Sequence, residues 1–218
     1  MSGSVAGNVY SKNANGAYVR NKGTVANRNT IPQQAARMIF AAISRGWAAL
    51  SAANKQSFID QVANYPFSNS LGETQIFTGK QLYSKLNNTL VSAGLSPIST
   101  CLAPISALPT VLNVDITAVN SVDILVSTGL FEVPTGCTMV LMATAPQTKG
   151  KYRPKRPDFK QIGTLAAEDP TLNLNLAANY SAVFGDEPSS GQKVFFAAFI
   201  VAQATGQKTA YNYGSLTV

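Results

Sequence analysis

The sequence predicts an α+β protein in two parts, an N-terminal extended arm with a small three-helix domain and a C-terminal all-β sandwich of the immunoglobulin or fibronectin type III kind. The spacing of apolar residues is helical in the first half of the chain and alternates as in strands in the second half. A proline-containing stretch, residues 95–109, separates the two patterns and is predicted to be a linker. The charge divides at the same place. Residues 1–100 hold nine Lys and Arg against two acidic residues, a surplus of +7, whereas residues 101–218 hold eight of each sign.

Residues 1–30 form the predicted arm, which contains too few large apolar side chains to build a core. Asn15-Gly16 is a strong turn dipeptide between two short apolar runs, so a hairpin is expected around it. An isolated hairpin is only marginally stable in water. We therefore expect the arm to lie on another polypeptide, a neighbouring subunit. The residues expected to make that contact are Val9, Tyr10, Tyr18, Val19 and Arg20.

Three helices are predicted within residues 31–94. At the start of the first helix, Thr30 is a suitable cap and Pro32 suits the first turn. Apolar residues then recur at steps of three and four from residue 36 to residue 50. Gly46 weakens this helix by about 1 kcal/mol relative to Ala. We therefore expect a bend or a close approach of another element at that position.

The second and third helices are bounded by recognisable caps. Ser51 caps the second helix, which stops before Pro66. The third helix begins after Thr78 and ends at Gly94, a typical C-terminal cap. This helical domain is expected to anchor the protein to its partner. The candidate anchor residues are Arg37, Phe40, Trp47 and Phe58.

Residues 110–218 are predicted to form the immunoglobulin-like β-sandwich. About seven short strands separated by turns over roughly 110 residues are typical of that architecture. One short helix, Ala177–Phe184, is expected to end at Gly185 and to bridge the two sheets. The clearest strand runs are Val111–Ile116, Val122–Val126, Met139–Met142, Phe159–Leu165, Val194–Ala202 and Thr209–Val218.

Charged residues make up only 12% of the 218 residues, about half of the share that is usual for globular domains. Neutral polar residues take their place, because 65 residues are Asn, Gln, Ser or Thr. Amides and hydroxyls can be buried against a partner at lower cost than ions. The composition therefore favours a subunit in a large assembly, and a plain soluble protein is the alternative that can share it.

The chain contains no His, which excludes Ser-His-Asp and Cys-His nucleophiles, His-ligated zinc and imidazole acid–base catalysis. The adjacent acids Glu168-Asp169 and Asp186-Glu187 each lie beside a proline, and solvated turns are the favoured interpretation. No glycine-rich phosphate-binding motif occurs. We therefore expect a non-enzymatic protein without a metal or cofactor.

No stretch reaches about 18 consecutive apolar residues, and the first thirty residues are polar and rich in Gly and Asn. We therefore expect neither a membrane span nor a secretory signal. Two cysteines in a chain without an export signal are more often buried thiols than a disulfide. This is the expectation for Cys101 and Cys137.

The densest run of charge holds six cations and one acid between residues 149 and 160. Such a loop can grip phosphates while Tyr152 stacks on a base. Because Pro154 and Pro157 stiffen the loop and only one aromatic residue is present, protein contact or solvation is favoured over nucleic acid. The candidate residues of this basic loop are Lys149, Lys151, Tyr152, Arg153, Lys155 and Arg156.

The pattern W-x-x-L-S-x-x-x-K-x-x-F at residues 47–58 is similar to that of DNA-bending HMG boxes. Packing of two helices by Trp47 and Phe58 explains the same spacing more simply, and the basic surplus is modest for a nucleic-acid binder. An architectural DNA-binding protein that uses the helices and the basic loop therefore remains an alternative.

Several motifs together carry a resemblance. They are GNVYSKN at residues 7–13, GAYVR at 16–20, QQAAR at 33–37, WAAL at 47–50 and TGKQLYSKLN at 78–87. With them, residues 5–95 resemble a group of bacterial and phage proteins that open with a GNxYSxNxxGxYVR arm and continue into a QQxxR…F…W helix. The segment from Gly191 to Phe195 is similar to the immunoglobulin-like module that often follows in that group.

The resemblance implies a phage virion component, assembled in the host cytoplasm, whose partners are other virion proteins in a multi-copy assembly. An auxiliary or decoration subunit of the head is the favoured function, and a tail or connector protein is an alternative. A sandwich that binds host glycans is a further alternative. It would need exposed aromatic residues, for which the candidates are Tyr180, Tyr211 and Tyr213.

Overall fold

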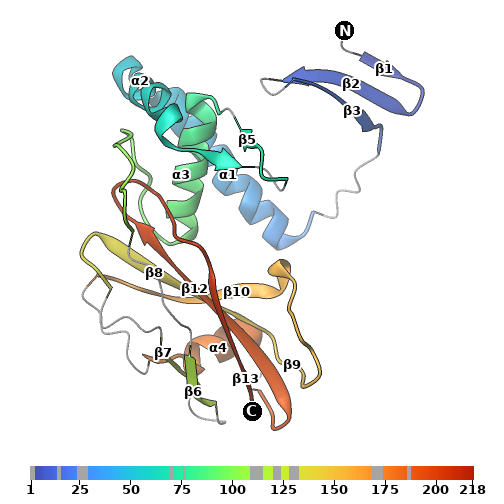
Figure 1. Ribbon diagram of the computed structural model, residues 1–218, viewed down its shortest axis with the longest axis vertical. Coiled ribbons are helices and arrows are strands. Elements are labelled where there is room, and N and C mark those ends of the chain that lie inside the picture. Colours follow the sequence, from blue (N-terminus) through green and yellow to red (C-terminus); the bar gives the residue numbers. More distant parts are fainter. Residues whose placement is uncertain are drawn as a thin grey trace. The chain divides into compact units, whose positions relative to one another are not determined.

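The computed structural model describes residues 3–13, 16–23, 29–68, 71–75, 77–108, 115–119, 124–127, 133–167, 174–185 and 188–218 (Figure 1). It is a mixed α and β fold that contains a multi-stranded antiparallel sheet. The chain divides into two compact units. One unit comprises Met1–Asn88 and Pro97–Pro104, and the other comprises Thr89–Ser96 and Ile105–Val218.

The arm forms a three-stranded antiparallel sheet rather than a simple hairpin. The predicted hairpin is present, because β2 pairs with β3 from Asn13↔Gly16 to Asn8↔Asn21. A further strand, β1, pairs with the outer edge of β2. The central turn residues, 14 and 15, lie outside the described residues. The three strands are β1 (Gly3–Val5), β2 (Asn8–Asn13) and β3 (Gly16–Asn21).

The helices begin where their caps predict. Gln33 Oε1 accepts a hydrogen bond of 3.3 Å from the backbone N–H of Thr30, and Ser51 Oγ accepts one of 3.2 Å from Asn54 N. Thr78 Oγ1 accepts from Gln81 N at 3.3 Å, while the Gln81 side chain accepts from Thr78 N at 2.8 Å. The helices are α1 (Ile31–Ala49), α2 (Ala52–Gln61) and α3 (Gly79–Ser92), with a 3-10 turn, Val62–Asn64, and a small hairpin of β4 (Phe67–Ser68) and β5 (Thr74–Gln75) between the last two.

An aromatic cluster forms the core of the helical domain. The ring of Phe58 lies 6.1 Å from that of Trp47 and 5.1 Å from that of Tyr83, in edge-to-face geometry. The close approach predicted at Gly46 is present, since a Cβ there would lie 2.6 Å from Tyr83 Oη. Phe58 is 0% exposed. Phe58 is therefore not an anchor for a partner, because the core of its own domain uses its whole side chain.

Residues 97–104, which the sequence assigned to a linker, pack against the helices. The buried Asn87 side chain donates to Ile98 O at 3.2 Å and accepts from Ile98 N at 2.6 Å. Further along, Ser57 Oγ accepts from the backbone of Cys101 at 3.0 Å. Prolines therefore mark an ordered return of the chain across the helical domain at this point. Cys101 and Cys137 are both buried free thiols, as predicted.

The second unit contains two antiparallel sheets. The larger has the strand order β10-β8-β12-β13, with β9 also paired to β12, and the smaller has the order β11-β7-β6. Most of the predicted run Val111–Ile116 lies outside the described residues, and the other predicted runs all contain strands. The strands are β6 (Asp115–Val119), β7 (Ile124–Ser127), β8 (Cys137–Thr144), β9 (Gln147–Thr148), β10 (Phe159–Leu165), β11 (Leu174–Asn175), β12 (Gln192–Ala202) and β13 (Asn212–Thr217).

The predicted short helix is present as α4 (Ala177–Phe184), and Gly185 follows it at φ 85°. Tyr180 of α4 is fully buried in the core beside Phe196 and Ile200 of β12, and its hydroxyl donates to Thr144 O at 2.9 Å. Tyr180 is therefore unavailable to a glycan, which corrects its candidacy as an exposed aromatic residue.

Replacement of Asn87 by Ala tests whether residues 97–104 belong to the helical domain. The variant leaves the partly buried N–H and C=O of Ile98 without their partner, so we expect the free energy of unfolding to fall by about 1–3 kcal/mol. Denaturant titration of the full chain measures this change. The exposed neighbour Asn88 supplies the control, because N88A removes the same chemical group from the surface. If N87A lowered the free energy of unfolding no more than N88A does, the hydrogen bonds of Asn87 would not hold residues 97–104 on the helical domain.

Candidate functional site

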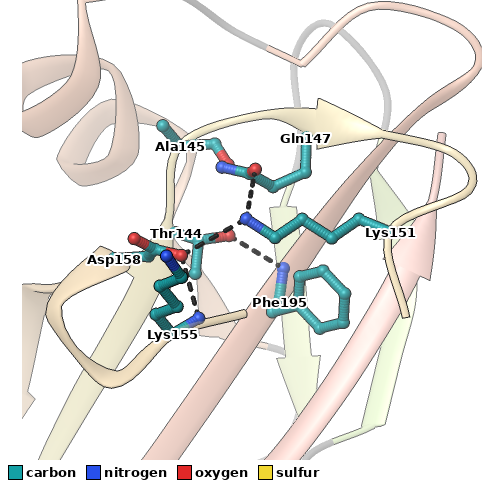
Figure 2. A network of polar contacts seen from close by, with 7 residues as sticks. All are labelled: Thr144, Ala145, Gln147, Lys151, Lys155, Asp158 and Phe195. Atoms are coloured by element: carbon teal, nitrogen blue, oxygen red, sulfur yellow. Dashed lines mark hydrogen bonds and ion pairs between the residues drawn. The ribbon is translucent and has the colours of Figure 1, made fainter. Parts of the chain in front are cut away.

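The basic loop joins β9 to β10, and a small polar network fixes its base (Figure 2). Lys151 Nζ donates to Gln147 Oε1 at 3.0 Å and pairs with Asp158 Oδ2 at 3.3 Å. The same carboxylate oxygen accepts the backbone N–H of Lys155 at 2.9 Å. Asp158 thus holds two points of the loop, three and seven residues before it.

The pKa of the Asp158 carboxyl group is lowered from its ordinary value. The largest cause is the hydrogen bond from the backbone N–H of Lys155. Desolvation, the next in size, raises the pKa, and the hydrogen bond and charge of Lys151 with the charge of Lys155 lower it again. The carboxylate form is therefore the one that the folded loop stabilises.

The loop lies beside a cavity of about 410 Å³ on the larger sheet. Strand register places Phe195 opposite Ser215 and Ala197 opposite Tyr213, so these residues share the sheet face opposite Phe196 and the core. The loop contributes a phenol ring and two guanidinium groups to the same cavity. The side chains that give it its character are Tyr152, Arg153, Arg156, Phe159, Phe195 and Tyr213.

Aromatic rings continue across this sheet face beyond the cavity. Tyr213 lies 5.6 Å from Phe159 and is stacked on Tyr211 at 6.1 Å, and Tyr211 lies 4.7 Å from Phe199. We call the connected rings of Phe159, Phe199, Tyr211 and Tyr213 the aromatic face. Tyr211 and Tyr213, two candidates for glycan contact, therefore belong to one continuous surface.

Two cations lie over the Tyr211 ring, Arg156 at 5.4 Å and Lys208 at 4.9 Å from its centroid. Lys208 Nζ also donates to the phenol oxygen at 3.2 Å. Burial raises the pKa of Tyr211, but the hydrogen bonds and charges of Lys208 and Arg156 outweigh burial, so the pKa is lowered overall. The aromatic face is therefore electropositive at this edge.

The arm residues are distributed over the two faces of their sheet. Tyr10 pairs with Val19, so both lie on one face, whereas Val9 pairs with Arg20 and Ser11 with Tyr18 on the other face. None of the described side chains of residues 3–23 is buried. The structure therefore brings Tyr10 and Val19 together and separates them from the other arm candidates.

The four helical anchor candidates divide between core and surface. Trp47 packs on Phe58 and Tyr83 in the core of the domain, as the simpler interpretation of its spacing had it. Phe40 is 64% exposed, and Arg37 is also exposed. The surface of α1 that a partner can reach therefore includes Arg37 and Phe40, while Trp47 is half-buried and Phe58 of α2 is fully buried.

Sequence reasoning found the basic loop but missed the rings beside it. Phe159 and Phe195 were assigned to strands without a role, and Tyr213 was named only as a candidate for glycan contact. Only the pairing register brings the three rings to Tyr152. One pattern pointed that way. The run Val194–Ala202 is apolar without alternation, which predicts a strand covered on both faces.

Comparison with protein-family models, with curated proteins and with solved structures found no significant match to this chain. Within the described residues, no group of three or more His, Cys, Asp or Glu side chains is placed to hold a metal ion. No helix among those residues has the length and apolar character needed to cross a membrane.

The lowered pKa of Asp158 predicts how the loop responds to acid. A carboxyl group whose pKa is lower in the folded state than in the unfolded state stabilises the fold above its unfolded pKa of about 3.9, and this contribution is lost as the pH falls through the folded value. The amide resonance of Lys155 should therefore titrate with a midpoint below about 3.9. In D158N this transition should be absent, and a wild-type midpoint at or above about 3.9 would refute the assignment.

Proposed function

We propose that this chain is a non-enzymatic structural subunit of a phage virion, an auxiliary or decoration protein of the head that binds neighbouring coat subunits through its arm and first helix. One observation carries the proposal. No described side chain between residues 3 and 42 is buried, although this stretch forms a three-stranded sheet and the first three turns of α1.

Such a segment has little to stabilise it in water. A small sheet without a packed face is marginal, and most helical stability in proteins comes from the packing of an apolar face. The first half of α1 nevertheless presents large apolar side chains, with Ile31 83% and Met38 70% exposed beside Phe40. Burial of a side chain of this size stabilises by about 1.5–3 kcal/mol. A partner surface that covers the segment would supply this energy.

The charge of the same segment indicates what the partner surface carries. Residues 1–59 contain seven Lys and Arg and no acidic residue. A protein surface with exposed carboxylates would complement it and would raise the rate of association at low salt. Coat subunits that present acidic side chains around an apolar patch are therefore the proposed partner.

We also propose that the second unit is an immunoglobulin-like or fibronectin type III-like sandwich. The support is its strand order. If β6 is taken as the first strand, the smaller sheet holds the first, second and fifth main strands, and the larger sheet holds the third, fourth, sixth and seventh. The short β9 is left out of this count. A sandwich of seven strands with Greek-key connections divides its strands between two sheets in this manner.

The motifs in residues 5–95 resemble those of bacterial and phage proteins, which supports the proposal that the chain meets its partner in a phage particle. Mass spectrometry of purified particles, separated into heads and tails, tests this assignment. Presence of the chain in heads supports the proposal, whereas presence in tails alone supports the tail alternative, and absence from both overturns the virion assignment.

Deletion of residues 1–30 tests the role of the arm. We expect the truncated chain to keep its helical core and its larger sheet, because the buried residues of both lie after residue 42. Incorporation into particles, measured by gel densitometry against the coat protein, should fall below detection. The thermal unfolding of the truncated chain is the control for its fold, and normal incorporation would refute the arm's role.

A pair of substitutions on the arm gives a finer test. Tyr10→Thr with Val19→Thr removes the apolar pair from one face while it keeps residues that favour strands. We expect incorporation to fall at least tenfold, because about 1.4 kcal/mol of lost contact corresponds to that factor. Ser4→Thr on the opposite face is the matched control and should incorporate normally.

A further inference from the structure

We propose that the cavity between the basic loop and the larger sheet binds one nucleotide of a single-stranded nucleic acid, with the base stacked on an exposed tyrosine ring and the phosphate held by Arg153 and Arg156. This site shares no residue with the arm or with α1, so it adds a ligand to the proposed assembly role. Its support comes from the rings, the charges and the lining of the cavity.

The rings of the cavity offer free faces. Tyr152 is 92% exposed and Tyr213 is 56% exposed, while Phe159 and Phe195 form the wall behind them. Bases of any sequence stack on such rings because every base has a π-face. The sequence of the loop contains a single aromatic residue, and for that reason protein contact was favoured over nucleic acid. The fold brings three further rings to the same cavity, and with them nucleic acid becomes the favoured ligand.

The charge of the cavity is complementary to a phosphate. Arg153 and Arg156 line it, and no acidic side chain is among the described residues of the lining. The one acid of the loop, Asp158, is engaged by Lys151 and by the backbone of Lys155. A guanidinium group offers planar paired donors that match phosphate oxygens. An anionic ligand therefore meets two arginines without a competing carboxylate there.

The guanidinium of Arg156 is also held in place before any ligand binds. Its carbon lies 5.4 Å from the centre of the Tyr211 ring, and the residue begins the 3-10 turn that Asp158 closes. A side chain fixed in this way loses less conformational entropy when it binds. The aromatic face thus supports one of the two phosphate contacts.

The lining favours a nucleotide over a sugar. Among its described residues there is no Asn, Gln, Asp or Glu, so the hydroxyl groups of a glycan would find few partners, and an unsatisfied buried polar group is costly. An extended peptide is also disfavoured. Among the described strands, β12 is paired along both edges, with β8 and with β13, and a ligand on the sheet face meets side chains rather than backbone groups. A cavity of about 410 Å³ takes a nucleotide, not a duplex.

Fluorescence anisotropy of the full chain with a labelled oligothymidylate tests the proposal. We expect Tyr152→Ala to weaken binding about tenfold, because a base stacked on an aromatic ring contributes on that scale. Tyr152→Phe keeps the ring and should bind as the wild type does. Since Tyr152 is almost wholly exposed, neither change disturbs the fold.

The arginine contact has its own readout and a matched control. Arg153→Gln should weaken binding and lower the slope of log affinity against log salt concentration by about one, as expected for the loss of one phosphate contact. Lys149→Gln removes the same charge from the same loop outside the cavity and should change neither the slope nor the affinity by a comparable amount.

Competitors separate the possible sources of the ligand. Thymidine monophosphate or an unlabelled oligonucleotide that displaces the probe supports the site, whereas displacement by an oligoglutamate or an acidic oligosaccharide alone overturns it. Absence of oligothymidylate binding also overturns the proposal. Equal affinities of the wild type, Y152A and R153Q overturn it as well, because the oligonucleotide would then be bound by another basic part of the chain, such as the arm.

Discussion

Strand β12 has no polar face, and the second unit is arranged around that constraint. From Val194 to Ala202 every side chain is buried, although an antiparallel strand usually has one solvated face. One face, formed by Val194, Phe196, Ala198 and Ile200, belongs to the same core cluster as Tyr180 of α4. On the other face, the rings of Phe159 from β10 and Tyr213 from β13 lie beside Phe195 and Ala197. The aromatic face is thus a consequence of a strand that must be covered on both sides.

Several cations of the second half gather at that same surface, which explains how a segment without net charge has a basic site, whereas Lys160 lies over Phe184 of α4. Six of its eight Lys and Arg lie between residues 149 and 160, and the other two, Lys193 and Lys208, lie over the rings of Phe195 and Phe199. A cation above a ring is attracted by the ring quadrupole and keeps part of its hydration. Rings that cover an apolar strand therefore also hold positively charged side chains. The zero net charge of residues 101–218 does not reveal that these cations lie close together.

Local patterns were sufficient for the helices and the longer strands, but they missed short strands such as β1 and β9 and were insufficient for the site. Caps at Thr30, Ser51 and Thr78 predicted where helices begin, because a cap needs only three neighbouring residues. The cavity joins Tyr152 to Tyr213, which are far apart in the chain, through a strand register that no local pattern specifies. The linker was misjudged for the same reason, since prolines are visible in the sequence and the Asn87 contact with Ile98 is not. The proposed immunoglobulin-like topology likewise depends on nonlocal pairing.

The two proposed contacts make opposite physical demands, and one chain can satisfy both. The arm and α1 expose aliphatic and aromatic side chains over a broad area, so only a folded surface of comparable extent can exclude water from them. The cavity exposes ring faces and guanidinium groups in a small volume, which suits a thin, flexible anion. No residue serves in both contacts. The arm and α1 belong to the first unit, and the residues of the cavity belong to the second. Salt should therefore weaken the cavity contact more than the arm contact, since apolar burial carries much of the latter and phosphate neutralisation carries the former.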